Sequence, residues 1–131
     1  MERRDINPTP WLQQLGIQHG IEVTALSRAL FISGQTSTAA DGSTVHPDDY
    51  VSQFQLAWSN LKDVLAEAGM TAENVIRLVV YTTEMATFRE NAETLGGMVA
   101  VDGTSPTMTL VGVTELFEAD LKVEIEATAV A

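Results

Sequence analysis

Residues 121–130, LKVEIEATAV, decide the fold, because apolar and polar side chains alternate along them as far as residue 129. The odd-numbered residues from Leu121 to Ala129 are apolar, and the even-numbered residues from Lys122 to Thr128 are polar. Successive side chains of a strand point to opposite faces of a sheet, so this segment is predicted to be a strand with one buried face and one polar face. Antiparallel sheets that are covered on one side show this pattern.

A long amphipathic helix is predicted at residues 48–68, where apolar side chains recur at steps of three and four. Pro47 suits the entry to this helix, and Gly69 suits the first position after its end. A second helix is predicted to begin at the capping-box pattern of Thr87–Glu90 and to run to about Val99.

Further strands are predicted at residues 19–25, 28–35, 75–83 and 107–113. The order β-β-α-β-α-β-β indicates a two-layer α+β domain, in which a mixed sheet carries two long helices on one face. A sheet covered on one side leaves its second face unburied, so we expect the protein to oligomerise through that face if it is partly apolar. Ser33, Val79 and Val111 are candidates for this surface.

The length of 131 residues is that of one domain, which we place at residues 1–131. Residues 1–18 are expected to form an irregular N-terminal segment, because Pro8 and Pro10 oppose an early helix.

The charge and composition exclude several classes of function. Asp and Glu outnumber Lys and Arg by 18 to 7, and the net charge of −11 repels nucleic-acid phosphates and anionic membrane surfaces. There is no cysteine, and the two histidines, His19 and His46, are far apart in the chain, so neither a metal nor a cofactor is expected. We find no signal-peptide core and no membrane-spanning apolar run, so the cytoplasm is the expected location.

Four motifs, taken together and in order, resemble those of the RidA/YjgF family of imine and enamine deaminases. These motifs are LFISGQ at residues 30–35, the helix end at 60–69, VYTT at 80–83 and VEIEATA at 123–129. The resemblance implies a chorismate-mutase-like fold. It also implies a homotrimer with clefts for small molecules between its subunits.

The resemblance also implies the residues of the site. The water-holding glutamate of the family corresponds to Glu124, and an arginine that binds the substrate carboxylate corresponds to Met108. The other implied ligand-binding residues are Ser33, Gly34, Gln35, Asn91 (or Ala92, by a second alignment) and His19. Without the resemblance, Glu124 and Glu126 would simply lie on a solvated strand face, about 7 Å apart.

Met108 has consequences for the ligand. Methionine has neither charge nor hydrogen-bond donor, so it cannot form the bidentate, charge-assisted pair that arginine makes with a carboxylate. A simple carboxylate is therefore a poor candidate for the ligand, unless Arg28 or Arg77 reaches the cleft.

Two functions are compatible with these residues. The first is a hydrolase or deaminase that acts on small reactive imines or related metabolites, with an altered substrate preference. The alternative is a non-catalytic trimer that binds or senses a small molecule in the same cleft. Ribonuclease activity, also ascribed to the family, is disfavoured by the acidic charge and by the absence of a basic groove.

Overall fold

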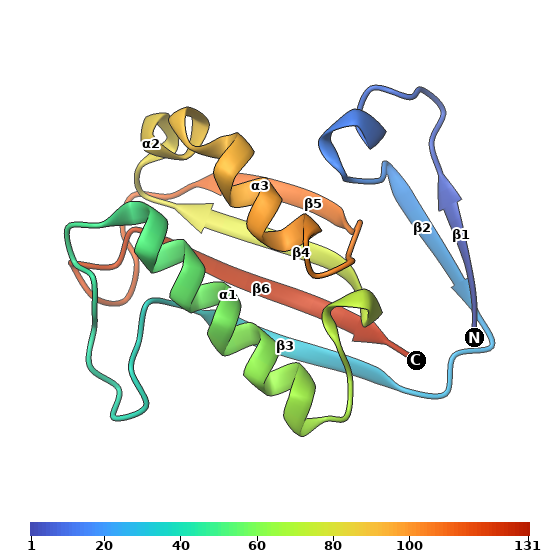
Figure 1. Ribbon diagram of the computed structural model, residues 1–131, viewed down its shortest axis with the longest axis horizontal. Coiled ribbons are helices and arrows are strands. Elements are labelled where there is room, and N and C mark those ends of the chain that lie inside the picture. The colour runs from blue at the N-terminus through green and yellow to red at the C-terminus, as the bar shows by residue number, and fades with distance from the viewer.

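A mixed four-stranded sheet, in the order β3-β6-β4-β5, forms one layer of the computed structural model, which describes residues 1–131 (Figure 1). Strands β4 and β5 are parallel, and the other two pairs are antiparallel. The strand bounds are β3 (Ala29–Gln35), β4 (Val75–Thr82), β5 (Thr107–Gly112) and β6 (Val123–Val130).

The second layer consists of helices on one face of this sheet (Figure 1). Helix α1 packs on β6 and β3, and α3 packs beside α1. The bounds are α1 (Tyr50–Glu67), α2 (Met85–Glu90) and α3 (Ala92–Ala100), with short 3-10 turns at Gln13–Leu15 and Ala72–Asn74. The predicted α+β class, the mixed sheet and the helical layer on one face are confirmed.

The ends of α1 follow the predicted signals. Asp49 is the N-cap, and its side chain accepts a hydrogen bond of 3.0 Å from the backbone N–H of Ser52. Gly69 follows the helix with a φ of +70°, a left-handed conformation that glycine adopts without strain.

The core lies between α1 and β6, as the alternating pattern of β6 predicts. The side chains of Val123, Ile125, Ala127 and Ala129 are all buried. The apolar stripe of α1 covers them with the buried residues Phe54, Ala57, Trp58, Leu61 and Leu65. Between α1 and the start of β6, the buried Gln53 accepts from the Lys122 N–H and donates to the Asp120 carbonyl, which fixes the entry to the strand.

The N-terminal segment is only partly irregular, which corrects part of the prediction for residues 1–18: residues 2–6 form a strand, and the rest are turns with one short 3-10 helix. Strand β1 (Glu2–Ile6) pairs antiparallel with β2 (Gly20–Thr24) as a two-stranded hairpin. Arg3 ties the hairpin to the domain by donating to the Ser105 carbonyl at 2.7 Å. The charged sequence of β1 has little strand propensity of its own, and its conformation comes from pairing with β2.

The second long helix is in fact two short ones, which corrects another prediction. The backbone leaves the helical conformation at Asn91, between α2 and α3, and the Asn91 side chain donates to the Thr87 carbonyl at 2.9 Å. Thr87 does not cap a helix, because α2 has already begun at Met85 and the Thr87 hydroxyl donates to Glu84.

Candidate functional site

Strand register assigns every side chain of the central strands to one of two faces. Leu78 and Val80 of β4 lie opposite Ala127 and Ile125 of β6, on the face that the helices cover. The other parity defines what we call the open face, which carries no helix (Figure 1). Its residues on β4, β5 and β6 include Arg77, Val79, Tyr81, Thr107, Thr109, Val111, Glu124, Glu126 and Thr128.

A β-bulge in β3 brings Gly34 against Glu124. Ile32 pairs with Ala127 and Gln35 pairs with Ile125, so Ser33 and Gly34 together occupy the place opposite one residue of β6. A Cβ atom on Gly34 would lie 2.6 Å from Cδ of Glu124 and 2.8 Å from its Cγ. Only glycine at this position allows the Glu124 carboxylate to rest on the β3 backbone.

The surroundings of Glu124 disfavour its charge. Partial burial raises the pKa of the Glu124 carboxyl above its usual value, and the nearby charge of Glu126 raises it further. Glu126 itself is held in place, because the Tyr81 hydroxyl donates to its Oε1 at 2.6 Å. The same hydrogen bond, more than burial, raises the pKa of Tyr81. A carboxylate with a raised pKa beside accessible space can hold a water molecule and take its proton.

Within the protomer Met108 and Glu124 lie on opposite faces of the sheet, so a cavity lined by both residues would have to lie between subunits. It lies opposite Leu78, which is 1% exposed, and it packs against the hydrophobic core. The parity of β5 therefore directs Met108 to the helix-covered face, whereas Glu124 lies on the open face.

Ser33 and Gln35 flank Gly34, and the Ser33 hydroxyl has no side-chain base hydrogen-bonded to it that could activate it as a nucleophile. The Gln35 side chain turns back and donates to the Ser33 carbonyl at 3.1 Å. The Ser33 side chain is exposed. These two residues and Gly34 are the implied ligand-binding residues that lie beside Glu124.

His19 and Asn91 lie elsewhere in the protomer. His19 is exposed next to β2, where its backbone N–H donates to Asn7 at 2.9 Å and its ring meets Trp11 edge-on. Its neighbour Gln18 bridges to Thr107, the first residue of β5, which lies at the end of the sheet away from Glu124. Asn91, with Ala92 after it, belongs to the junction of α2 and α3 in the helical layer.

Arg28 and Arg77, the two cations that could replace the family arginine, lie in different parts of the fold. Arg28 donates to the Ala68 carbonyl at 2.9 Å, so it caps the end of α1. Arg77 is exposed on the open face opposite Thr107 and Thr128. It lies four residues before Tyr81, about 13 Å along the strand from the row of Glu124.

Tyr81 is the member of this cluster that sequence reasoning missed. It reads as one more apolar residue in the strand VIRLVVYT, and only the β4–β6 register places it opposite Glu124. The antiparallel pairing of the two strands and the parity of Glu124 are the signals that could have found it.

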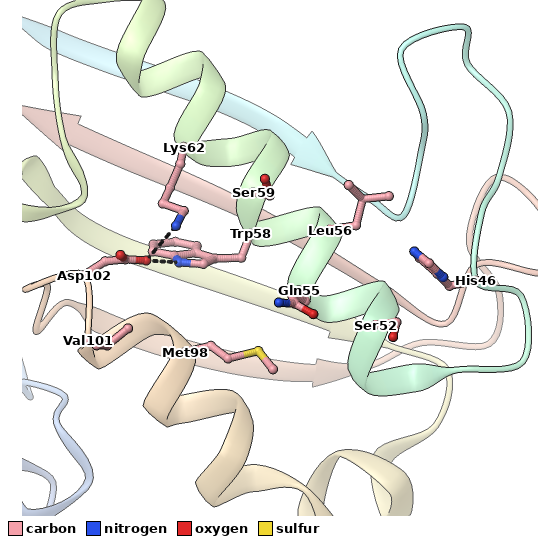
Figure 2. Close-up of a pocket in the computed structure, with 10 residues that line it drawn as sticks. All are labelled: His46, Ser52, Gln55, Leu56, Trp58, Ser59, Lys62, Met98, Val101 and Asp102. Carbon is pink, nitrogen blue, oxygen red and sulfur yellow. Dashed lines mark hydrogen bonds and ion pairs between the residues drawn. The ribbon is translucent and has the colours of Figure 1, made fainter.

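A hollow of about 520 Å³ lies in the helical layer, between α1 and α3 (Figure 2). Three of its polar side chains, Trp58, Lys62 and Asp102, are paired with one another. Asp102 accepts from the Trp58 indole N–H at 2.7 Å and from Lys62 at 3.0 Å, as Figure 2 shows. The Trp58 hydrogen bond is the main reason why the pKa of Asp102 is lowered. None of the predicted site residues lines this hollow.

Two further observations concern classes of site. No group of three or more His, Asp or Glu side chains is placed to hold a metal ion. No helix of the chain combines the length and the apolar character that a membrane crossing requires.

Met108→Arg is expected to destabilise the fold and not to create a carboxylate clamp beside Glu124. The substitution puts a charge where Met108 now packs on the core, and we expect it to lower the unfolding free energy by about 2 kcal/mol or more. Urea unfolding measures the effect. The control is Met108→Leu, which conserves volume and is expected to cost less than about 1.5 kcal/mol. An arginine variant as stable as the leucine variant would contradict the placement of residue 108.

Comparison with known proteins places this geometry in a family. The family model described as Endoribonuclease L-PSP matches residues 18–131. The RutC family protein YjgH of Escherichia coli (strain K12) is 34% identical over 98 residues, covering 75% of this chain and 73% of that protein. The putative reactive intermediate deaminase TdcF of the same organism is 30% identical over 106 residues, covering 80% of this chain and 81% of TdcF.

Solved structures of the same family have a similar fold. YyfB from Yersinia pestis, a protein of unknown function of the conserved Rid protein family, superposes with a TM-score of 0.86 at 34% identity, over 100% of both chains. The structure of E. coli TdcF with bound serine gives a TM-score of 0.72 at 27% identity, over 98% of this chain and 99% of that one. The chain therefore belongs to the RidA/YjgF family, whose family model carries the description Endoribonuclease L-PSP.

Proposed function

We propose that this protein is a deaminase that hydrolyses the C=N bond of small reactive imines, with Glu124 as the group that holds and activates water. The observation that carries the proposal is the seat of Glu124, whose carboxylate rests on Gly34 with its pKa raised by burial and by Glu126. The likeness to TdcF, a putative reactive intermediate deaminase, supports the same class of reaction.

The reaction needs no group beyond a base and water. Glu124 takes a proton from a water molecule while the water oxygen attacks the imine carbon, and the π electrons of the C=N bond move to nitrogen. The proton held by Glu124 then passes to nitrogen, which gives a carbinolamine. Glu124 next takes the hydroxyl proton of the carbinolamine and delivers it to the amine nitrogen while the C–N bond breaks, and the products are a carbonyl compound and ammonia. The raised pKa suits this step, because the ideal general base titrates near the working pH.

The substrate preference follows from the missing cation. Within the protomer no cation adjoins Glu124: the uncharged Met108 faces the other side of the sheet, and Arg77 lies toward the opposite end of the open face. A substrate carboxylate would meet two glutamates and no adjacent cation at the Glu124 site. We therefore propose that imines derived from amino acids are poor substrates.

The test is release of ammonia and carbonyl product from freshly generated imines, with and without a carboxylate group. Turnover above the spontaneous rate of hydrolysis on at least one imine is the expected result. Saturable binding of imines or their stable analogues, with no acceleration, would support the non-catalytic alternative and refute the deaminase. RNA is a poor substrate candidate, because the net charge is −11.

We further propose that the open face is where the chain assembles into a homotrimer. Phe31 of β3 is 79% exposed and lies opposite Thr128 on that face, and monomeric proteins rarely leave large apolar patches uncovered. In such an assembly the Glu124 site lies at a subunit boundary.

Phe31→Glu is expected to convert the assembly to monomers, because it places a charge in the proposed contact. Light scattering coupled to size exclusion measures the mass. Val101→Glu is the matched control: Val101 is 82% exposed but follows α3 in the helical layer, so this variant is expected to keep three times the chain mass. Loss of assembly in the control alone would place the interface on the helical side.

A further inference from the structure

The cluster of Glu124, Glu126 and Tyr81 also bears on which imines enter the site. We propose that Glu126, held by the Tyr81 hydroxyl, makes the site selective for protonated, cationic imines that carry no carboxylate. This inference rests on the proposed deaminase function and goes further, because it assigns the charge of the substrate and the residue that recognises it.

The position of Glu126 is fixed by geometry. Glu124 and Glu126 are two residues apart on β6, so their side chains leave the same face about 7 Å apart along the strand. The Tyr81 hydroxyl stands between the two rows, because Tyr81 lies opposite Glu124 while its oxygen donates to Glu126 at 2.6 Å. This hydrogen bond holds the Glu126 carboxylate in place on the open face, next to the reacting position.

No cation within the protomer forms an ion pair with Glu124 or Glu126. The open-face side chains of β3 and β5 beside it, among them Ser33, Thr109 and Val111, are uncharged. On β4 the charged residue is Arg77, which forms no ion pair with either glutamate. It lies about 7 Å along the strand from Val79, the residue opposite Glu126. Lys122 precedes β6, but its ammonium lies 3.9 Å from Glu84 at the start of α2.

Two carboxylates without a matching cation favour a positively charged ligand. An imine whose nitrogen is protonated is a cation, and it is also the form whose carbon water attacks most readily. Hydrolysis of the cation conserves its charge: the iminium ion and water give a carbonyl compound and an ammonium ion, with the water proton passing through Glu124 to nitrogen. Glu126 can therefore stabilise the positive charge of the entering iminium ion and of the departing ammonium ion, whereas a substrate carboxylate would be repelled.

The experiment compares two imines of nearly equal size, generated freshly by oxidation of the parent amines. The first is the imine of ethyl methyl ketone, and the second is the imino acid in which a carboxylate replaces the methyl group. The wild type is expected to prefer the ketone imine by about tenfold or more in kcat/KM, the size of effect that one nearby charge produces in a partly buried site. Both substrates are measured on each variant, so that a general loss of folded protein cancels in the ratio.

Glu126→Gln is expected to reduce the preference by about tenfold, and Tyr81→Phe by about threefold, because the phenylalanine leaves the carboxylate present but no longer held. Glu93→Gln, an exposed glutamate of α3, changes the net charge equally and is expected to keep the wild-type ratio. A wild type that prefers the imino acid, or a Glu126→Gln variant with an unchanged ratio, would overturn the inference.

A binding measurement separates this inference from the proposed reaction. The ammonium ion of the parent amine is stable, and calorimetry can follow its binding without any turnover. Weaker binding of this cation to Glu126→Gln than to Glu93→Gln supports charge selection, even if neither imine is hydrolysed and the deaminase proposal fails. Equal binding to the two variants would refute charge selection, even if both imines are hydrolysed.

Discussion

Glu124→Gln is expected to lower kcat/KM for imine hydrolysis by about 10²–10⁴-fold, the usual contribution of a general base. The amide has nearly the shape of the carboxyl group and still fits on Gly34, but it cannot take a proton from water. Rates of ammonia release at saturating and limiting imine concentrations give the measurement. Because substrate contacts are retained, we expect the loss mainly in kcat.

The same variant is expected to be more stable than the wild type at neutral pH. The pKa of Glu124 is higher in the folded chain than in the unfolded chain, so its ionisation destabilises the fold as the pH rises through the folded pKa. Glutamine removes this cost. Thermal unfolding should therefore show a higher melting temperature for Glu124→Gln at pH 7, and little difference at a pH below the usual glutamate pKa, where the wild-type carboxyl is protonated in both states.

Glu93→Gln serves as the control for both measurements, because its side chain is exposed and remote from the open face. It should change neither kcat nor the melting temperature appreciably. A Glu124→Gln variant that keeps activity within about twofold would exclude Glu124 as the base. Lost activity together with lost stability at pH 7 would indicate a structural role for the carboxylate.

The parts of the fold that local sequence determines were predictable. Apolar and polar residues alternate along β6 because one face of the strand packs on α1. Apolar residues recur every three or four positions in α1 because one side of the helix packs on β6. Each pattern is therefore visible in the sequence of its own element. The α1 boundaries were predictable for the same reason, since Asp49 and Gly69 act within one turn of the helix.

The errors concern features that depend on distant parts of the chain. Strand β1 exists because β2 pairs with it, and the helix breaks at Asn91 although nothing in its own turn requires this. The face of Met108 depends on the register of β5 against β4, and a shift of one residue would reverse it. The sequence could therefore name Glu124 and Gly34 as candidate site residues through the family resemblance, whereas their contact and the addition of Tyr81 required the register of three strands.

Gly34→Ala is expected to reduce kcat/KM by about 10²-fold without touching any reacting group, the cost of misplacing a catalytic group by about 1 Å. The added methyl group would overlap the Glu124 carboxylate and force it off the β3 backbone. Because Glu124 is a flexible, half-exposed side chain that can turn aside, the unfolding free energy is expected to fall by less than about 1 kcal/mol. Imine turnover and urea unfolding on the same preparation measure both effects.

The glycines of α3 provide the control for this substitution. A Cβ on Gly97 meets nothing within 4 Å, so Gly97→Ala should leave activity unchanged and raise helix stability by up to about 1 kcal/mol. Gly34→Ala with full activity would show that the carboxylate does not need the β3 backbone as its seat.

The double variant Gly34→Ala/Glu124→Gln decides whether the glycine acts through the carboxylate. If the only function of Gly34 is to position the Glu124 carboxylate, replacing Gly34 should not lower the activity further once Glu124 is already glutamine. The double variant should then be no less active than Glu124→Gln alone, and the two single losses should be strongly non-additive. Additive losses would mean that the β3 bulge also contacts the substrate directly, through the backbone groups that Ser33 and Gly34 leave out of the regular β3–β6 pairing.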